Sequence, residues 1–101
     1  MPMAIAKETM SHKRVYVVIR GCVQGVGFRA SCARRASALG VAGWVRNAWD
    51  GSVEALFEGE AAVVDAMVRW CHDGPPMADV TGVEVADAPD ASTERGFRVR
   101  G

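Results

Sequence analysis

Three glycines and one arginine lie close together near the start of the chain, in a stretch that holds no acidic side chain. Gly21, Gly25 and Gly27 fall within seven residues, and Arg29 follows the last of them by two positions. Glycine allows positive φ angles, so successive main-chain N–H groups can converge into a concave nest at the start of a helix. An arginine there can hold two phosphate oxygens with its planar guanidinium group. The pattern is typical of a site for a dianionic phosphate, and by itself it is equally compatible with a simple tight turn.

Asn47 is a second residue whose type and position suit chemistry. Its carboxamide offers an acceptor oxygen and two donors, so it can orient a water molecule while it is anchored elsewhere. Asn47 also comes shortly before Asp50 and Gly51, which together are typical of a hairpin turn. Asparagine is common beside such turns, so the spacing alone favours a structural role over a catalytic one.

The hydrophobic pattern predicts the elements that must position these residues. Strands are indicated by β-branched or alternating apolar runs, and helices by apolar residues three or four apart that end at a glycine. The predicted strands are residues 15–20, 41–48, 52–58, 80–85 and 97–99, and the predicted helices are residues 28–39 and 60–72. The order is βαββαβ, followed by a short additional strand.

This order predicts an α+β fold. Right-handed crossovers place the first and third strands at the centre of the sheet and both helices on one face. We therefore expect a ferredoxin-like βαββαβ sandwich with a four- to five-stranded antiparallel sheet. A chain of 101 residues supports one core, so residues 13–101 are expected to form a single domain and residues 1–12 a disordered extension.

Composition and charge exclude several classes of protein. The formal net charge is zero, which gives no general attraction to nucleic acid or to an anionic membrane. No apolar run approaches the roughly 20 residues that cross a bilayer, and the first residues lack a secretory signal, so we expect a cytoplasmic protein. Cys22, Cys32 and Cys71 have no CxxC spacing and are expected to be free thiols rather than disulfides or zinc ligands.

Arg29 and Asn47 each belong to a longer motif, and both motifs resemble the signature of the acylphosphatase family. Residues 21–29 read GCVQGVGFR, which matches G-x-V-Q-G-V-x-F-R, and residues 43–47 read GWVRN, which matches G-x-V-x-N. The resemblance covers roughly residues 14–100. With both motifs present in the correct order, phosphate binding is favoured over a simple turn at the glycine-rich loop.

The resemblance implies an enzyme, a hydrolase that converts small acyl phosphates into a carboxylate and inorganic phosphate without a metal or another cofactor. Arg29 would be the catalytic residue that binds the phosphoryl group, and Asn47 would position the nucleophilic water. The residues implied in phosphate binding are Cys22, Val23, Gln24, Gly25, Val26, Gly27, Phe28 and Arg29. We expect a monomer whose partners are the acyl phosphate and inorganic phosphate, with no nucleic acid and no membrane.

The chemistry of an acyl phosphate suits a site with no histidine, no pair of carboxylates and no metal cluster. The leaving group is a carboxylate, whose conjugate acid has a pKa of about 4 to 5, so it departs without taking a proton. A phosphate monoester would expel an alkoxide and would normally require a general acid or a metal. Phosphate monoesters are therefore expected to be poor substrates.

Two other functional classes share part of this pattern. A cysteine phosphatase would use Cys22 and Arg29, but its motif resembles C-x5-R, and here six residues separate the two. An RNA-recognition module has the same βαββαβ order, but it needs aromatic residues exposed on the central strands. The first strand offers only Tyr16, and Phe57 shares the buried parity of its strand.

A third alternative and several single residues complete the expectations. Acylphosphatase-like domains also resemble the opening part of hydrogenase-maturation factors, and a chain that ends at Gly101 favours the simple hydrolase. Trp44 and Trp70 are expected in the core, whereas Trp49 is expected to be exposed or to border the site. The side chains expected on the solvated face of the first helix are Arg34 and Arg35.

Overall fold

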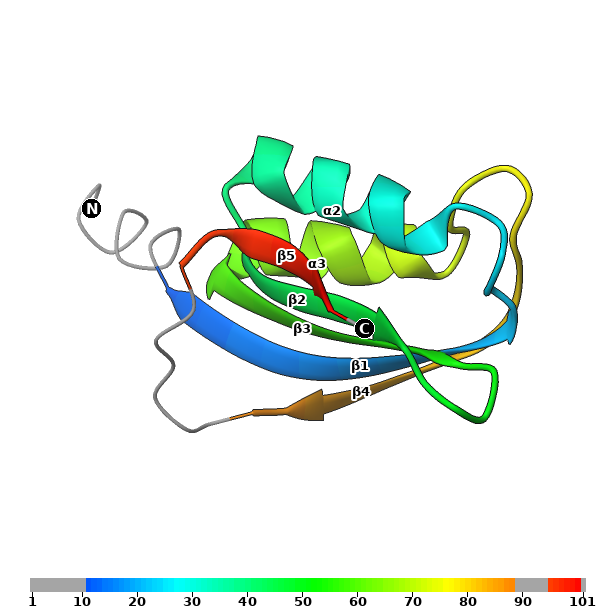
Figure 1. Cartoon of the computed structure of the whole chain (residues 1–101). Helices are drawn as coiled ribbons and strands as arrows, with labels where there is room; N and C mark the ends of the chain where they lie inside the picture. The colour runs from blue at the N-terminus through cyan, green and yellow to red at the C-terminus, as the bar shows by residue number, and fades with distance from the viewer. Residues whose placement is uncertain (1–10, 89–94, 101) are drawn as a thin grey trace.

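The computed structural model describes residues 11–88 and 95–100, and it contains two helices and five strands in this part of the chain (Figure 1). The elements are β1 (His12–Cys22), α2 (Phe28–Leu39), β2 (Ala42–Asn47), β3 (Val53–Glu60), α3 (Ala61–Cys71), β4 (Asp79–Asp87) and β5 (Phe97–Arg100). Neither helix of the described residues is long and apolar enough to cross a membrane. The order βαββαβ with a short extra strand is the one predicted.

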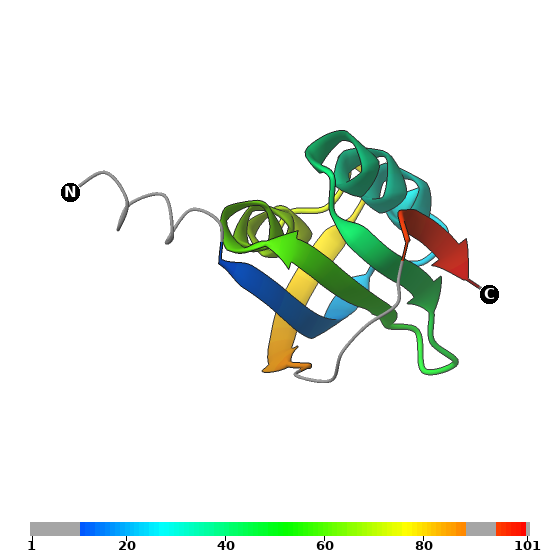
Figure 2. The same ribbon diagram turned by 90° about the vertical axis from the view of Figure 1, so that its left-hand side faces the viewer.

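The five strands form one sheet in the order β4-β1-β3-β2-β5, and both helices cover the same face of it (Figures 1 and 2). The pairs β4–β1, β1–β3 and β3–β2 are antiparallel. This arrangement confirms the ferredoxin-like α+β fold, with β1 and β3 at the centre of the four main strands.

The sheet is mixed rather than wholly antiparallel, because β5 runs parallel to β2. This differs from the expectation of an antiparallel sheet. The reason lies in the direction of β4, which runs opposite to β1 and therefore leaves the sheet at the end where β2 begins. The next strand must run back in the direction of β2, and it adds to the outer edge of that strand.

The core lies between the sheet and the two helices, and two hydrophobic periods build it. Alternate residues of β1, β2 and β3 face the helices, whereas residues three or four apart on each helix face the sheet. The buried residues that these elements contribute are Val15, Val17, Ile19, Phe28, Cys32, Ala36, Val45, Val53, Ala55, Phe57, Val64, Met67 and Cys71. The two patterns meet in a single cluster.

The three cysteines are free thiols, as expected, but their surroundings differ. Cys32 and Cys71 are fully buried between the helices and the sheet, whereas Cys22 is exposed. Burial disfavours the charged thiolate, so it raises the pKa of Cys71 to about 12 and raises the pKa of Cys32 as well. The two core cysteines therefore behave as small apolar side chains.

The first strand is longer than predicted at both ends. It begins at His12, inside the expected extension of residues 1–12, of which residues 1–10 lie outside the described part of the chain. It ends at Cys22 because Gly21 and Cys22 pair with Val80 and Asp79 of β4, after a register shift at Gly21. The loop before α2 is thus residues 23–27. Residues 89–94, which lie between the predicted strands at residues 80–85 and 97–99, are also outside the described residues.

Trp44 does not lie in the core, contrary to expectation, but on the face of the sheet that the helices leave open. Trp44 pairs with Leu56 of β3, and Leu56 pairs with Tyr16 of β1. The three side chains therefore share that face. Leu56 is 4% exposed because the two aromatic rings flank it, which explains why it breaks the alternation of β3. The guanidinium groups of Arg46 and Arg100 lie over the Trp44 ring, 5.6 Å and 4.9 Å from its centroid.

The other two tryptophans lie where the sequence predicts. Trp70 packs against the core, and its ring lies 5.1 Å from that of Phe28. Trp49 is 99% exposed in the turn between β2 and β3.

Gly43 offers a direct test of the packing between β2 and β3. Its φ is 139°, and a Cβ added there would overlap the main-chain carbonyl group of Leu56. We expect Gly43→Ala to lower the free energy of unfolding by about 2 kcal/mol or more, because the strand must move away from its neighbour. Urea denaturation followed by circular dichroism measures this loss.

Gly82→Ala is the matched control, because Gly82 also lies in a strand but has open space where the Cβ would be. We expect this variant to change the free energy of unfolding by less than about 1 kcal/mol. Equal urea midpoints for the two variants would contradict the close approach of β2 to the Leu56 carbonyl.

Candidate active site

The loop between β1 and α2 has the main-chain geometry of an anion site. Gly25 and Gly27 have φ angles of 76° and 81°, in the left-handed region that favours glycine. Gly27 stands at the start of α2, where no side chain caps the helix and the first turn holds no acidic residue. The first N–H groups of α2 are therefore not satisfied by a capping side chain, and the positive end of the helix dipole faces the loop.

A pocket of about 260 Å³ opens where this loop meets the ends of β2 and β5. Its lining residues are Val23, Gly25, Gly27, Phe28, Arg29, Ala30, Asn47 and Val99. Arg29 is half-buried in the first turn of α2, and Asn47 is the last residue of β2. The structure thus brings together the two residues that the motifs single out, and the lining contains no acidic side chain.

Asn47 has an unusual environment for a polar side chain. Its Oδ1 atom is buried and accepts no hydrogen bond from the described residues. An unpaired buried acceptor costs free energy, roughly 1–3 kcal/mol, so such atoms usually have a partner. The side chain lines the pocket, where a water molecule would satisfy this oxygen.

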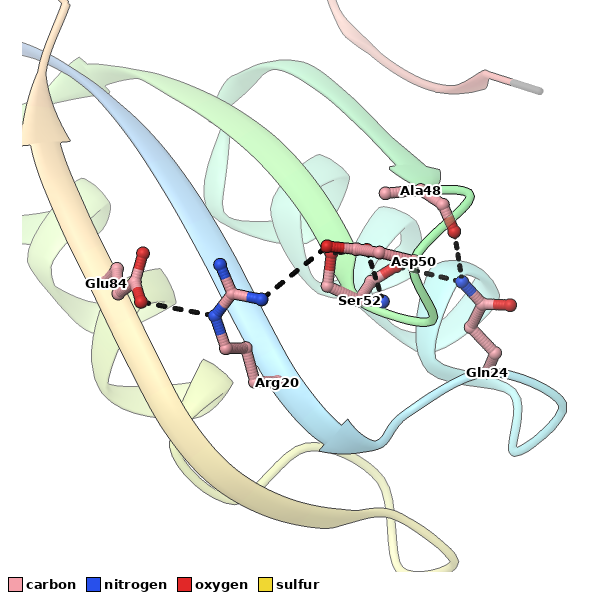
Figure 3. Close-up of polar contacts among 6 residues, drawn as sticks. All are labelled: Arg20, Gln24, Ala48, Asp50, Ser52 and Glu84. Atoms are coloured by element: carbon pink, nitrogen blue, oxygen red, sulfur yellow. Dashed lines mark hydrogen bonds and ion pairs between the residues drawn. The ribbon is translucent and has the colours of Figure 1, made fainter.

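Gln24 connects the loop to the turn that follows Asn47 (Figure 3). Its Nε2 donates hydrogen bonds to the carbonyl oxygens of Ala48 and Ser52, at 2.7 Å and 2.9 Å. The same turn is closed by a bond of 2.8 Å from the Ala48 N–H to the Ser52 carbonyl oxygen. The loop and the end of β2 are therefore held together by side-chain hydrogen bonds as well as by the sheet.

Asp50 fixes the shape of this turn from the other side. Its Oδ1 accepts hydrogen bonds from the Ser52 hydroxyl and main-chain N–H, at 2.6 Å and 3.0 Å. The Ser52 hydroxyl bond is the main reason that the pKa of Asp50 lies below its usual value. Arg20 lies between Asp50 and Glu84, at 3.6 Å and 3.1 Å, and these exposed ion pairs add little to stability (Figure 3).

The remaining residues of the motif lie near the pocket but do not line it. Cys22 is the exposed last residue of β1, and Val26 packs against the hydrophobic core. The Gln24 side chain points to the turn between β2 and β3 (Figure 3). Of the predicted phosphate-binding residues, the structure therefore places Val23, Gly25, Gly27, Phe28 and Arg29 around the pocket.

Two residues of the pocket were not predicted from the sequence, Ala30 and Val99. Ala30 follows Arg29 directly, so its place in the first turn of α2 could have been noted. Val99 is 47% exposed and pairs with Val45, two residues before Asn47. No sequence signal reveals that pairing, because it depends on the parallel addition of β5 to β2.

Comparisons with a family model and with curated proteins point to the same family. A model of the acylphosphatase family matches residues 15–99. An acylphosphatase of Rubrobacter xylanophilus is 58% identical over 98 residues, which cover 97% of this chain and 86% of that protein. An acylphosphatase of Methylococcus capsulatus is 57% identical over 75 residues, which cover 74% of this chain and 82% of that protein.

Solved structures show the same similarity in three dimensions. The acylphosphatase from Bacillus subtilis superposes with a TM-score of 0.84 at 31% identity, covering 90% of this chain and 100% of that one. The acylphosphatase from Coxiella burnetii gives 0.81 at 34% identity, covering 88% and 93%. A structure of full-length HypF also matches, with a TM-score of 0.82 at 25% identity, over 91% of this chain but only 12% of that protein.

The family model covers most of the chain, and the two relatives are more than half identical over 82% to 86% of their own length. The glycine-rich loop and the pocket that holds Arg29 and Asn47 fall inside the matched residues. The chain belongs to the acylphosphatase family and is a hydrolase that acts on acid anhydrides, the acyl phosphates.

Proposed function

We propose that the pocket of about 260 Å³ is where the acyl phosphate is hydrolysed without a metal, with the phosphoryl group held by the loop and Arg29 and the water held by Asn47. The observation that carries this proposal is the buried Oδ1 of Asn47, which no described residue satisfies. It belongs to a side chain that lines the same pocket as Gly25, Gly27 and Arg29.

Phosphate binding rests on three sources of positive potential that converge on the loop. The N-terminus of α2 supplies N–H groups and its dipole, and the left-handed glycines turn the loop backbone toward the pocket. Arg29 supplies a planar guanidinium group that matches two oxygens. No lining residue is acidic, so a phosphate dianion meets no repulsion from side chains in the pocket.

The hydrolytic step follows from these positions. The Asn47 Oδ1 accepts a hydrogen bond from a water molecule, which leaves an oxygen lone pair free to attack the phosphorus. A new P–O bond forms to this water while the bond from phosphorus to the acyl oxygen breaks. The carboxylate departs with the electron pair of that bond. One proton of the water passes to a phosphate oxygen, and the other stays on the oxygen that is now bonded to phosphorus.

The site needs no acid to assist the leaving group. A carboxylate leaves as a stable anion, and phosphoryl transfer depends mainly on positioning and on stabilisation of negative charge. The lining residues contain no histidine, cysteine or carboxylate that could serve as a general acid. We therefore expect the enzyme to cleave small acyl phosphates such as benzoyl phosphate and to leave phosphate monoesters largely intact.

Substitution of Asn47 and Arg29 tests the two assigned roles. We expect Asn47→Ala and Arg29→Ala each to lower turnover of benzoyl phosphate by about 100- to 1,000-fold, because each removes a group that positions or stabilises the reacting atoms. Arg29→Lys keeps the positive charge but loses the planar guanidinium group that binds two oxygens. Its activity should therefore fall between that of the parent enzyme and that of Arg29→Ala.

Arg69→Ala is the control for a lost positive charge, because Arg69 is exposed on α3 and does not line the pocket. Its turnover should equal that of the parent enzyme. Near-parent turnover by Asn47→Ala or Arg29→Ala, with the fold intact by circular dichroism, would remove the corresponding residue from the mechanism.

The role of metal ions is tested with a chelator. We expect benzoyl phosphate hydrolysis to continue at an unchanged rate after dialysis against EDTA, because the residues around the pocket favour amide and guanidinium contacts over metal ligands. Loss of activity in EDTA, with recovery on addition of a divalent cation, would show that the metal-free mechanism is wrong.

Gln24 provides a test of how the loop is positioned. Gln24→Met preserves the size of the side chain but leaves the carbonyl oxygens of Ala48 and Ser52 without its donor. We expect turnover to fall by about 10- to 100-fold, because the loop and Asn47 are then no longer held in a fixed position relative to each other. Steady-state kinetics below the unfolding temperature measure this effect, and an unchanged kcat would show that the sheet alone aligns the two.

A further inference from the structure

A second and larger pocket, of about 410 Å³, lies between α2 and the segment that follows α3. The residues that give it its character are Ser31, Arg34, Arg35, Trp70, Pro75 and Pro76. It shares no lining residue with the candidate active site. Its volume falls within the range of pockets that hold small organic ligands.

The two arginines of this pocket have no carboxylate partner among the described residues. Arg34 and Arg35 are exposed, and neither forms an ion pair with a carboxylate in residues 11–88 or 95–100. Other arginines differ, since Arg20 and Arg46 each contact a glutamate. The pocket therefore presents two positive charges to solvent, with no acidic residue among those that line it.

Ser31 adds a hydroxyl group to the lining of this pocket, beside the two arginines. Arg34 donates a bond of 3.2 Å to the Ser31 Oγ, which acts as the acceptor. The hydroxyl hydrogen of Ser31 has no acceptor within the described residues and can be given to a ligand oxygen. Two guanidinium groups and one hydroxyl, all hydrogen-bond donors, thus line the same pocket.

The rest of the pocket lining is mostly apolar. The ring of Trp70 is fixed by packing on Phe28, at 5.1 Å between centroids and 54° between planes. Gly74, in the turn after α3, has a φ of 67° and donates to the carbonyl oxygen of Trp70, and Pro75 and Pro76 follow it in the lining of the pocket. The half-buried indole of Trp70 and the exposed ring of Pro76 offer apolar surface on which a flat ring can stack, whereas Pro75 is buried.

We propose that this pocket binds an organic phosphate that carries a flat ring, at a site separate from catalysis. Two guanidinium groups match the double charge of a phosphate monoester better than the single charge of a carboxylate. Ser31 donates to the same phosphate, and the ring lies against Trp70 and Pro76. The proposal concerns a different set of residues from the proposed hydrolytic mechanism and does not depend on it.

Isothermal titration calorimetry with adenosine monophosphate and with phenyl phosphate tests the ligand class. The protein carries Arg29→Ala in this experiment, so that binding in the candidate active site is suppressed. We expect both probes to bind with a stoichiometry near one. Adenosine and inorganic phosphate, which each lack one half of the ligand, should bind at least about tenfold more weakly.

Substitutions assign the binding to the pocket. We expect Arg34→Gln and Arg35→Gln each to raise the dissociation constant of adenosine monophosphate about tenfold, because each removes a charge-assisted hydrogen bond. Arg69→Gln is the matched control, since it removes an exposed positive charge from α3 outside the pocket. It should change the constant by less than about twofold. Hydrolysis of benzoyl phosphate by Arg34→Gln and Arg35→Gln should equal that of the parent.

Three results would overturn the proposal. The first is the absence of binding by both ring phosphates, in the parent protein as well as in the Arg29→Ala variant. The second is binding by inorganic phosphate as tight as that of the two probes, because it would show that the ring makes no contact. The third is binding that Arg29→Ala abolishes while Arg34→Gln and Arg35→Gln leave it intact, since the probe would then occupy the candidate active site.

Discussion

The position of the site depends on the pairing of β3 with both of its neighbours. Val53 pairs with Ile19 of β1 on one side and with Asn47 of β2 on the other. Because both pairs are antiparallel, β1 and β2 run in the same direction and end at the same edge of the sheet. The loop that follows β1 and the last residue of β2 therefore lie at the same edge, separated only by β3. A slip of one residue would turn Asn47 to the opposite face.

This register also explains how the proposed mechanism can use so few chemical groups. The proposed phosphate site relies on main-chain amides, because the backbone of residues 23–27 and the start of α2 are held in place by β1 and the core. Gln24 then ties the loop to the turn after Asn47 through two carbonyl oxygens. The net charge of zero is no obstacle, since the positive potential is a local property of one helix end and one arginine.

Much of the fold follows from the sequence, because strong periodic patterns decide it. The helix at residues 28–39 has the predicted bounds, since Gly40 stops it and its apolar residues keep helical spacing. Tertiary pairing decides the rest. Gly21 is typical of a turn, yet β4 keeps it in β1, and the place of Trp44 on the open face depends on which parity of β2 faces the helices.

The site shows the same division. Arg29 and Asn47 could be selected because two motifs place them beside a glycine-rich loop, and the pocket brings them together. Val99 could not, because only the parallel pairing of β5 with β2 carries it there. The side-chain contacts of Gln24 could not be predicted either: a sequence shows that an amide side chain is present in a loop, but not which carbonyl groups lie within its reach.

The different surroundings of the three cysteines have a practical consequence for chemical labelling. Alkylating reagents attack the thiolate, and burial keeps Cys32 and Cys71 protonated and out of reach at neutral pH. Cys22 is exposed and directly precedes Val23, the first residue of the pocket. A fluorophore added to the native protein would therefore attach at one position, next to the loop, without any engineered cysteine.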